Sequence, residues 1–449
     1  MISSKFIFDK ANQVISSGNL TEQQMTHLSS IETLSDGSVL SVATLAALPN
    51  VVSNIGSLVY VVAENKYYYS DGVTWNINYS SSDATTYITY AWGSNSSGRL
   101  GDGTTVSKSS PVTVVGGITN WSQLFAGNSS NLALTSTGIA YAWGVNASGQ
   151  LGDGTTSNRS SPVTVIGGIT NWSQLSVGTS HCLGVTSTGI AYAWGYNTYG
   201  GLGDNTATNR SSPVTVVGGL SWSRVSAGLR YSLGVTTTGI AYAWGQNTSG
   251  ILADGTTTSR SSPVTVVGGI TNWSQLSAGF THVLGLTSSG IAYAWGNASN
   301  GRLGDGTAVT KYSPVSVVGG ITNWTQVSAG QTHSLGLTST GIAYAWGTNS
   351  SGELGDGTFT SRSSPVTVIG GITNWSQVST SGFGTHNLGL TTTGIAYAWG
   401  NNTYGKLGVG DTASNRTSPV TVVGGITNWS RVSAGGDHSL GIVTIPKGF

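Results

Sequence analysis

The sequence predicts an all-β fold in which residues 86–449 form a seven-bladed β-propeller of four-stranded blades. A unit of about 50 residues recurs seven times, which is typical of propeller arrays. Each unit holds short apolar segments separated by Gly-rich turns, and none shows the 3.6-residue apolar period of a helical solenoid. The tetrapeptide Tyr-Ala-Trp-Gly marks every unit, at intervals of 50 to 53 residues, and places its tryptophan at Trp92, Trp143, Trp194, Trp244, Trp295, Trp346 and Trp399.

Four strands can be placed in each repeat. In the sixth, residues 334–338 and 342–347 flank a Ser-Thr-Gly turn and predict a β-hairpin. After a Gly-rich loop, residues 365–369 form a third strand with proline at its start, where no ladder hydrogen bond is lost. A Gly-Gly-Ile-Thr turn then leads to a fourth strand over residues 374–379, and the loop before the next hairpin is expected to join two blades.

The ends of the array predict how the ring closes. It begins with the second hairpin strand alone, residues 87–92, and stops after the first hairpin strand alone, residues 439–444. Pairing these two strands would complete one blade from both termini and remove the exposed sheet edges of an open array.

Residues 1–85 predict a separate small α+β module. A capping-box pattern, Thr21-x-x-Gln24, suggests a helix to about Leu34, and residues 41–48, followed by Pro49, suggest a second. Segments 58–62, 66–70 and 73–77 predict a three-stranded meander.

Composition narrows the function classes. Only 7% of residues are charged, against about 25% in ordinary domains, and the net charge of +1 gives no reason to expect nucleic acid as a partner. The chain shows neither an apolar leader nor a stretch of 18 apolar residues, so we expect no membrane insertion. Cys182 is the sole cysteine, which excludes a disulfide within the chain.

Acidic and basic residues recur in pairs. The acids follow Leu-Gly in most repeats, and a base follows each acid by five or six residues, which predicts an ion pair within each loop; a charged ring that grips a ligand is the alternative. The acids are Asp102, Asp153, Asp204, Asp254, Asp305, Asp356 and Asp411, and the bases are Lys108, Arg159, Arg210, Arg260, Lys311, Arg362 and Arg416.

One repeat position carries histidine in five repeats, and Asn131 and Tyr231 in the others. Because Asn, Tyr and His exchange more readily as hydrogen-bonding groups than as metal ligands, we expect buried structural residues and no metal. The repeat tryptophans are expected to be structural too. The histidines are His181, His282, His333, His386 and His438.

Catalysis has few candidate residues. Glu353 and Asp437 are the only propeller carboxylates outside the repeated pairs, and no Gly-x-Ser-x-Gly, P-loop or His-Glu-x-x-His motif occurs. We therefore expect a protein that is not an enzyme and needs no cofactor. A polysaccharide-degrading enzyme that uses these two acids stays open as an alternative.

Positions that differ among near-identical repeats are candidates for recognition. They cluster in the loops after Trp-Gly and in the loops before the histidine position, and strand alternation places both sets on one face of the ring. Loops on a rigid scaffold are usual sites of binding, with drift in unconstrained loops as the competing explanation. The residues expected to contact a ligand are Arg99, Tyr199, Ile251, Phe280, Arg302, Glu353, Tyr404 and Lys406.

The repeat resembles the regulator-of-chromosome-condensation repeat. The resemblance rests on Tyr-Ala-Trp-Gly, Asn-x-x-Gly-x-Leu-Gly-Asp-Gly (residues 349–357), Arg-x-x-Pro and Ala-Gly-x-x-His-Ser-Leu (residues 329–335), and covers about 360 residues. It implies a propeller but little about function, because that fold serves exchange factors, scaffolds and other roles. In residues 1–85, Leu-Pro, Tyr-Tyr-Tyr-Ser-Asp-Gly and Thr-Trp resemble small modules of tailed-phage fibre and other virion proteins.

These observations lead to two main hypotheses. The first is a virion structural protein, similar to a tail fibre, located in the tail or another surface appendage. Its residues 1–85 would attach to other virion proteins, and its propeller would bind a cell-surface ligand such as a glycan. The alternative is a cytoplasmic propeller scaffold or GTPase exchange factor, although a basic tail and a distinctive insertion are missing.

Overall fold

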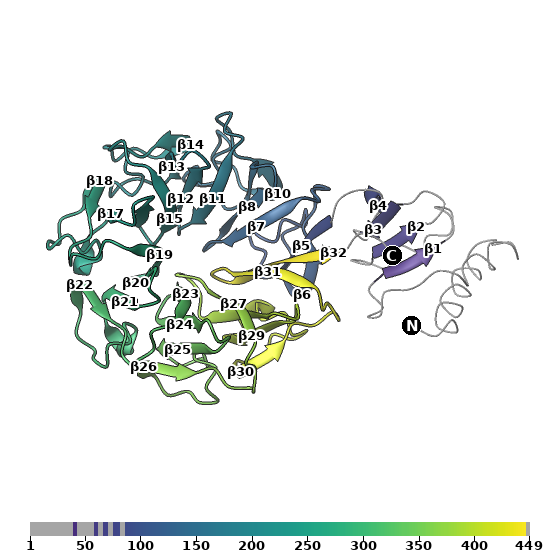
Figure 1. Cartoon of the computed structure of the whole chain (residues 1–449). Coiled ribbons are helices and arrows are strands. Elements are labelled where there is room, and N and C mark those ends of the chain that lie inside the picture. The colour runs from purple at the N-terminus through teal and green to yellow at the C-terminus, as the bar shows by residue number, and fades with distance from the viewer. Residues whose placement is uncertain (1–38, 43–57, 62–65, 71–74, 81–85, 446–449) are drawn as a thin grey trace, which may run out of the picture.

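The computed structural model describes residues 39–42, 58–61, 66–70, 75–80 and 86–445 (Figure 1). Residues 86–445 form a ring of seven four-stranded antiparallel sheets, which confirms the predicted seven-bladed propeller. The first strands of neighbouring blades contact one another around the centre of the ring. The fourth strands lie at the rim (Figure 1).

The strands of each blade follow in chain order, except in the seventh. Blades 1 to 3 comprise β7 Trp121–Ala126, β8 Ser130–Thr135, β9 Ala140–Gly144, β10 Arg159–Thr164; β11 Trp172–Val177, β12 His181–Thr186, β13 Ala191–Gly195, β14 Arg210–Thr215; and β15 Trp222–Ala227, β16 Tyr231–Thr236, β17 Ala241–Gly245, β18 Arg260–Thr265.

Blades 4 to 6 comprise β19 Trp273–Ala278, β20 His282–Thr287, β21 Ala292–Gly296, β22 Lys311–Ser316; β23 Trp324–Ala329, β24 His333–Thr338, β25 Ala343–Gly347, β26 Arg362–Thr367; and β27 Trp375–Thr380, β28 His386–Thr391, β29 Ala396–Gly400, β30 Arg416–Thr421. Short 3₁₀ turns occur at η4 Thr248–Gly250, η5 Ser299–Gly301 and η6 Thr403–Gly405.

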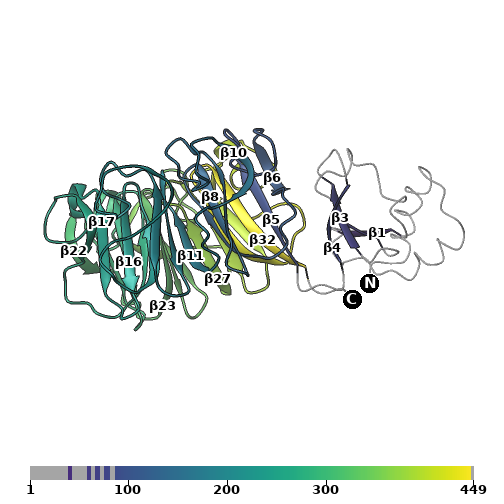
Figure 2. The ribbon, with the colours of Figure 1, turned by 90° about the horizontal axis from the view of Figure 1, so that it is seen from above.

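Blade 7 closes the ring with strands from both ends of the array. It contains β31 Trp429–Ala434, β32 His438–Ile445, β5 Thr86–Gly93 and β6 Lys108–Thr113. β32 and β5 pair over eight residues, with Ser439 opposite Trp92 and Thr444 opposite Tyr87, as the sequence predicted. Figure 2 shows these two strands side by side in yellow and dark blue.

The boundary between blades differs from the prediction by one strand. The strand that begins with the second tryptophan of each repeat, such as β11 with Trp172, is hydrogen-bonded to the next strand, which carries the histidine position, such as β12. The reason is that the connection between them, residues 178–180, is short enough for a hairpin. The Gly-Gly-Ile-Thr turn therefore joins two blades, and the loop before the histidine lies within one blade. Because antiparallel connections still alternate, the loops before histidine and after Trp-Gly share a face.

The core lies between blades. One cluster joins Leu132, Ala142 and Leu151 of blade 1 to Trp172 and Trp194 of blade 2. The two indole rings lie 5.7 Å apart at 54°. Aromatic pairs of this geometry add about 0.5–1.5 kcal/mol beyond area burial. Since every blade contributes a similar wedge to the next, each interface is a separate hydrophobic core.

Glycine on the second strand makes room for this packing. A Cβ on Gly184 would lie 2.4 Å from the Trp172 ring, so the ring rests on bare backbone. Blade 1 has Ala133 at the equivalent position, and there the Trp121 and Trp143 rings lie 6.4 Å apart, further than in the other blades. The extra methyl thus coincides with a wider aromatic pair.

A four-stranded sheet precedes the propeller. It comprises β1 Val39–Val42, β2 Leu58–Val61, β3 Lys66–Ser70 and β4 Trp75–Ser80. The last three form the predicted meander, and β1 adds a parallel strand beside β2. The helix predicted over residues 41–48 is wrong at its start, because residues 41 and 42 belong to β1, whose ladder with β2 takes up their backbone hydrogen bonds. The helix predicted over residues 21–34 lies outside the described residues.

Candidate binding face

Two sets of loops make up what we call the variable face: those between the first and second strands and those between the third and fourth strands of each blade. Side chains connect the two sets directly. Arg302 of blade 4 donates to Thr281, and Lys406 of blade 6 pairs with Asp437 of blade 7. The opposite face, here called the constant face, carries the Ser/Thr-Gly turns and the Gly-Gly-Ile-Thr turns, which also contact each other, as in the Ser187 N–H bond to Asn171 O.

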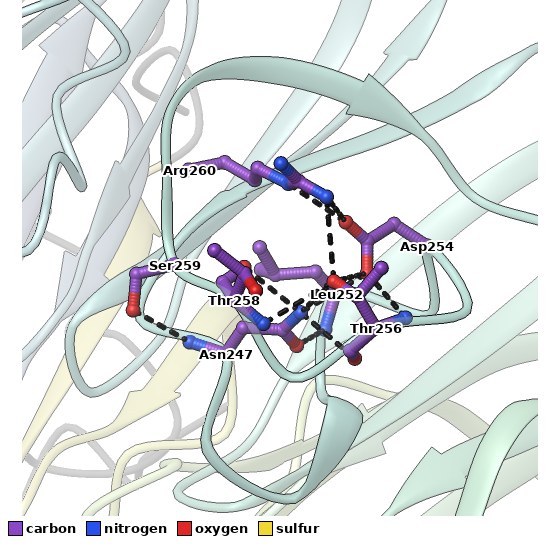
Figure 3. Close-up of polar contacts among 7 residues, drawn as sticks. All are labelled: Asn247, Leu252, Asp254, Thr256, Thr258, Ser259 and Arg260. Atoms are coloured by element: carbon purple, nitrogen blue, oxygen red, sulfur yellow. Dashed lines mark hydrogen bonds and ion pairs between the residues drawn. The ribbon is translucent and has the colours of Figure 1, made fainter.

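A buried asparagine organises most of the third-to-fourth-strand loops (Figure 3). In blade 3, Asn247 Nδ2 donates to Asp254 Oδ1 at 3.0 Å and to the carbonyls of Thr256 and Thr258 at 3.0 and 3.1 Å. Asn247 Oδ1 accepts the N–H of Leu252 at 3.0 Å. One amide thereby satisfies several backbone groups of a loop without regular structure. Blade 4 has the buried Ala298 at this position.

Six of the seven predicted acid–base pairs are present as ion pairs within their own loops. In blade 3, Arg260 contacts Asp254 at 2.8 Å. Burial opposes ionisation of Asp254, but hydrogen bonds from Thr256, Arg260 and Asn247 outweigh it and hold the pKa of this carboxyl below its ordinary value. In blade 7, Asp102 accepts bonds from Thr104 and Asn95.

The most variable loop position contributes a constant backbone group. Its carbonyl oxygen accepts the indole N–H of the next blade's tryptophan in all seven repeats, as Arg302 O does from Trp346 at 3.0 Å. In six repeats it also accepts a bond from the second strand, as Arg302 O does from Ser334 at 2.8 Å. Since only the carbonyl is required, the side chain at this position is free to vary.

Burial separates the eight residues expected to contact a ligand into two groups. Five of them are at most 8% exposed. Four of these brace the loops: Arg99 bonds to Ser96, Arg302 to Ser299 and Thr281, Glu353 to the Ser351 N–H, and Lys406 to Asp437. Ile251 joins the core between blades 3 and 4. Burial also lowers the pKa of Arg99 and Arg302 and raises that of Glu353. Sequence reasoning missed this group's bracing role, because it counted variation as accessibility.

The accessible group is aromatic. Tyr199 and Phe280 are half-buried, and Tyr404 is 51% exposed. Tyr404 has φ 65°, a left-handed conformation that costs a non-glycine residue about 1–2 kcal/mol. Phe280 of blade 4 meets Phe383 of blade 6 edge to face at 6.4 Å, because the loop that holds Phe383 is longer than its equivalents and reaches past blade 5.

Tyr199 belongs to a cluster that spans blades 2 and 3. The Arg230 guanidinium lies 5.1 Å from the centroid of the Tyr199 ring, and the centroid of the Tyr196 ring lies 6.5 Å from that of Tyr199. All three side chains are partly accessible. Arg230 precedes Tyr231, where histidine would normally stand, so comparison of the repeats could have identified it.

The repeated histidines link blades through a ring of buried bonds. His333 Nε2 lies 2.6 Å from Asn387 Oδ1 of the next blade, and His181 Nε2 lies 2.9 Å from Ser232 Oγ. Ser232 donates its own proton to Gly201 O, so the histidine must be the donor and is the neutral Nε2–H tautomer. Burial lowers the pKa of His181 and His333 to about 4.

Tyr231 takes the histidine position in blade 3 and donates to Gly279 O at 2.8 Å in the next blade. The prediction that Asn131 fills this position in blade 1 is wrong by one residue, because Ser130 pairs with Gly144 as His181 pairs with Gly195. In residues 86–445, Nδ1 of His282, His333, His386 and His438 has no hydrogen-bond partner, so a second proton there would lack an acceptor. The described part of the chain contains no group of three or more His, Cys, Asp or Glu side chains placed to hold a metal ion. It likewise contains no helix long and apolar enough to cross a membrane.

A family model for the RCC1-like domain matches residues 89–441, which is nearly the whole ring. The chain belongs to the RCC1-like domain family. Its propeller is 31% identical over 327 residues to the ultraviolet-B receptor of Arabidopsis thaliana, covering 72% of this chain and 62% of the receptor. It is 30% identical over 362 residues to the human E3 ubiquitin-protein ligase HERC2, covering 78% of this chain and 6% of the ligase.

The RCC1-like chain thus spans about three-fifths of the receptor and a small part of the ligase. A solved structure of Prp20p from Saccharomyces cerevisiae shares the fold with a TM-score of 0.68 at 20% identity, over 80% of this chain and 92% of that one.

Proposed function

We propose that this RCC1-like propeller is a non-enzymatic protein-binding module that engages its partner through the variable face. The observation that carries the proposal is the cluster of Tyr196, Tyr199 and Arg230, with the exposed Tyr404 on the same face. Tyrosine and arginine dominate the energetics of protein interfaces, because they offer large contact areas and directed hydrogen bonds at low entropic cost. The braced loops beneath them would limit the ordering cost of binding.

The backbone of Tyr404 supports the same reading. Serine or asparagine fills the equivalent turn position in most repeats, and Ser97, Ser249 and Asn300 take the same left-handed conformation there. Asparagine tolerates this conformation better than tyrosine does. An exposed tyrosine held there at a conformational cost suggests a role outside folding, as is common for strained residues.

The two singular carboxylates favour a non-enzymatic role. Glu353 is 1% exposed and accepts the Ser351 N–H at 2.7 Å, and Asp437 pairs with Lys406 at 2.9 Å. Each has a bracing partner. The glycosidase alternative predicts that Glu353→Gln would abolish release of reducing ends from a polysaccharide, and we expect no such activity in the wild type.

The relatives favour a protein-binding scaffold or exchange factor over a virion component. Prp20p, which shares the fold, has been characterised for its binding to Gsp1p and histones. Release of labelled GDP from a panel of small GTPases would test exchange activity directly. Attachment to a virion through residues 1–85, and recognition of a cell-surface glycan by the propeller, stay predictions, tested by looking for the protein in purified particles.

The test of the variable face is a double substitution, Tyr199→Ala with Tyr404→Ala. Affinity-purified wild type and variant would be compared by quantitative mass spectrometry of co-purifying proteins from the producing cell. The matched control, Thr119→Ala with Thr322→Ala, alters the constant face. Partners should be lost at least tenfold from the tyrosine variant and retained by the control. Loss in the control alone would assign recognition to the other face.

A further inference from the structure

The innermost strand of each blade would present an unpaired edge toward the centre of the ring, and side chains from the preceding blade cover most of these edges. Gln275 Nε2 donates to Val327 O at 3.0 Å, and Val327 N–H donates to Gln275 Oε1 at 3.2 Å. Ser277 Oγ accepts the Ala329 N–H at 2.9 Å. The glutamine amide thereby replaces the strand that would otherwise pair with this edge.

Arginine replaces this glutamine in two of the seven blades, at Arg224 and Arg431. Both side chains are exposed. Arg224 forms no side-chain hydrogen bond or ion pair within residues 86–445, and it therefore leaves the inner strand edge at Leu276 without the glutamine bridge. The stability of the fold therefore does not explain why an arginine stands at this position.

Arg224 lines a pocket of about 470 Å³ at the constant-face end of the first strands. This volume lies within the roughly 300–1,000 Å³ of small-molecule sites. The other lining residues come from blades 4, 5 and 6: Ser274, Gln275, Leu286, Thr325, Gln326, Leu337 and Ser376. Arg224 is the single charged residue among them.

The hydroxyl groups of this pocket can offer only acceptors to a ligand. Ser274 Oγ donates its proton to Leu286 O, Thr325 Oγ1 to Leu337 O and Ser376 Oγ to Leu390 O, at 3.0 to 3.1 Å. Each oxygen keeps free lone pairs. A ligand that uses these three oxygens must bring donors, as a row of sugar hydroxyls does.

The amides and the guanidinium supply the complementary groups. Gln275 and Gln326 each use one N–H on the next strand and retain a second. Arg224 offers a planar fork that matches a carboxylate in bidentate geometry. Every carboxylate of residues 86–445 lies in a variable-face loop, so no acid of this ring competes for Arg224 on the constant face.

We propose that this pocket binds an anionic sugar of the uronic acid class, with its carboxylate on Arg224 and its hydroxyls on Ser274, Thr325 and Ser376. The site lies opposite the variable face and is independent of the protein-binding role proposed above. It would bind without chemistry, because no carboxylate or other general base lines it.

Three probes separate the parts of the proposal. Methyl β-D-glucuronide carries the carboxylate and the hydroxyls, methyl β-D-glucoside carries the hydroxyls alone, and acetate carries the carboxylate alone. Titration of the full-length protein, followed by isothermal calorimetry and saturation-transfer NMR, should show the glucuronide binding at least tenfold more tightly than either partial probe.

Arg224→Gln is the decisive variant, because glutamine occupies this position in five of the seven blades and makes the bridge in four of them, so it should restore the bridge to Leu276. We expect it to fold, to raise or keep the urea midpoint, and to lose glucuronide affinity at least tenfold. Arg431→Gln, outside the pocket, should bind like wild type. Unchanged affinity in Arg224→Gln, equal losses in both variants, equal binding of a partial probe, or no binding of the glucuronide would each overturn the proposal.

Discussion

Two polar networks recur around this ring, and they follow opposite electrostatic rules. The inner ring of histidines, with Tyr231, is fully buried and neutral, and it connects six of the seven blades to the next. The loop networks at the variable face, such as Asp254 with Arg260, are charged, partly exposed and remain within one blade. Where water is excluded, the repeat uses neutral donors and acceptors, whose desolvation costs far less than that of ions.

This difference predicts that the inner ring loses stability at low pH, whereas the loop networks tolerate single substitutions. The histidines have folded-state pKa values below the unfolded value of about 6.5, so the unfolded chain takes up protons first as the pH falls. Their contribution to stability is complete above pH 6.5 and is lost between that pH and the folded pKa, which is about 4 for His181 and about 3 for His438.

The largest expected effect is therefore acid unfolding. Lowering the pH from 7 to 5 should cost about 2 kcal/mol of unfolding free energy for each buried histidine, since one pKa unit corresponds to about 1.4 kcal/mol. Urea denaturation at both pH values, followed by tryptophan fluorescence, would measure this. His181→Ser, which installs the residue found at this position in blade 1, Ser130, should show a smaller loss between pH 7 and 5 than wild type. Equal pH dependence in both proteins would contradict the assignment.

A smaller effect is expected in the loop network, where Asn247→Ala should cost about 2–4 kcal/mol. The substitution leaves the Leu252 N–H and the Thr256 and Thr258 carbonyls without their partner. The fold should survive, because blade 4 closes the same loop around Ala298. Thermal denaturation with Thr248→Ala, an exposed neighbour, as the control would check this. A cost no greater than that of Thr248→Ala would show that the amide is dispensable.

The smallest effect is expected for the ion pair itself. Arg260→Met should cost no more than about 1 kcal/mol, because a third of the Arg260 side chain is exposed and solvent screens the pair. The difference from wild type should shrink further when urea denaturation is repeated in 1 M salt. A cost above that of Asn247→Ala would reverse the ranking of amide and ion pair.

Repetition explains why the sequence predicted the fold so well. The Tyr-Ala-Trp-Gly segment that holds Trp92 occurs seven times with the same turns, and this repetition predicts the number of blades. It also predicts the closure between residues 87–92 and 439–444. The blade boundary was misplaced because strand order in a repeat is cyclic, and only the hydrogen bonding of β11 to β12 shows where a blade begins.

The candidate face was less predictable. Arg302 and Glu353 vary between repeats, as binding residues do, but the repeats share only the carbonyl at this position, and these two side chains brace their loops. Side-chain direction decides between these explanations, and a sequence pattern does not contain it. Comparison of the repeats could have identified Arg224, because glutamine stands at this position in most of them. Its significance depends on the Gln275 bridge, which only the structure shows.

The closing blade also determines how the ring would respond to force. Thr86 lies opposite Ile445, so the chain enters and leaves the propeller at the same end of the β32–β5 ladder. Tension between the two ends would load these hydrogen bonds one after another, as a zipper opens, and the ladder would part at low force. Tension between either end and a partner on the variable face would instead pull along the strands and load many bonds together. The ring should accordingly resist a pull from its partner better than a pull between its own ends.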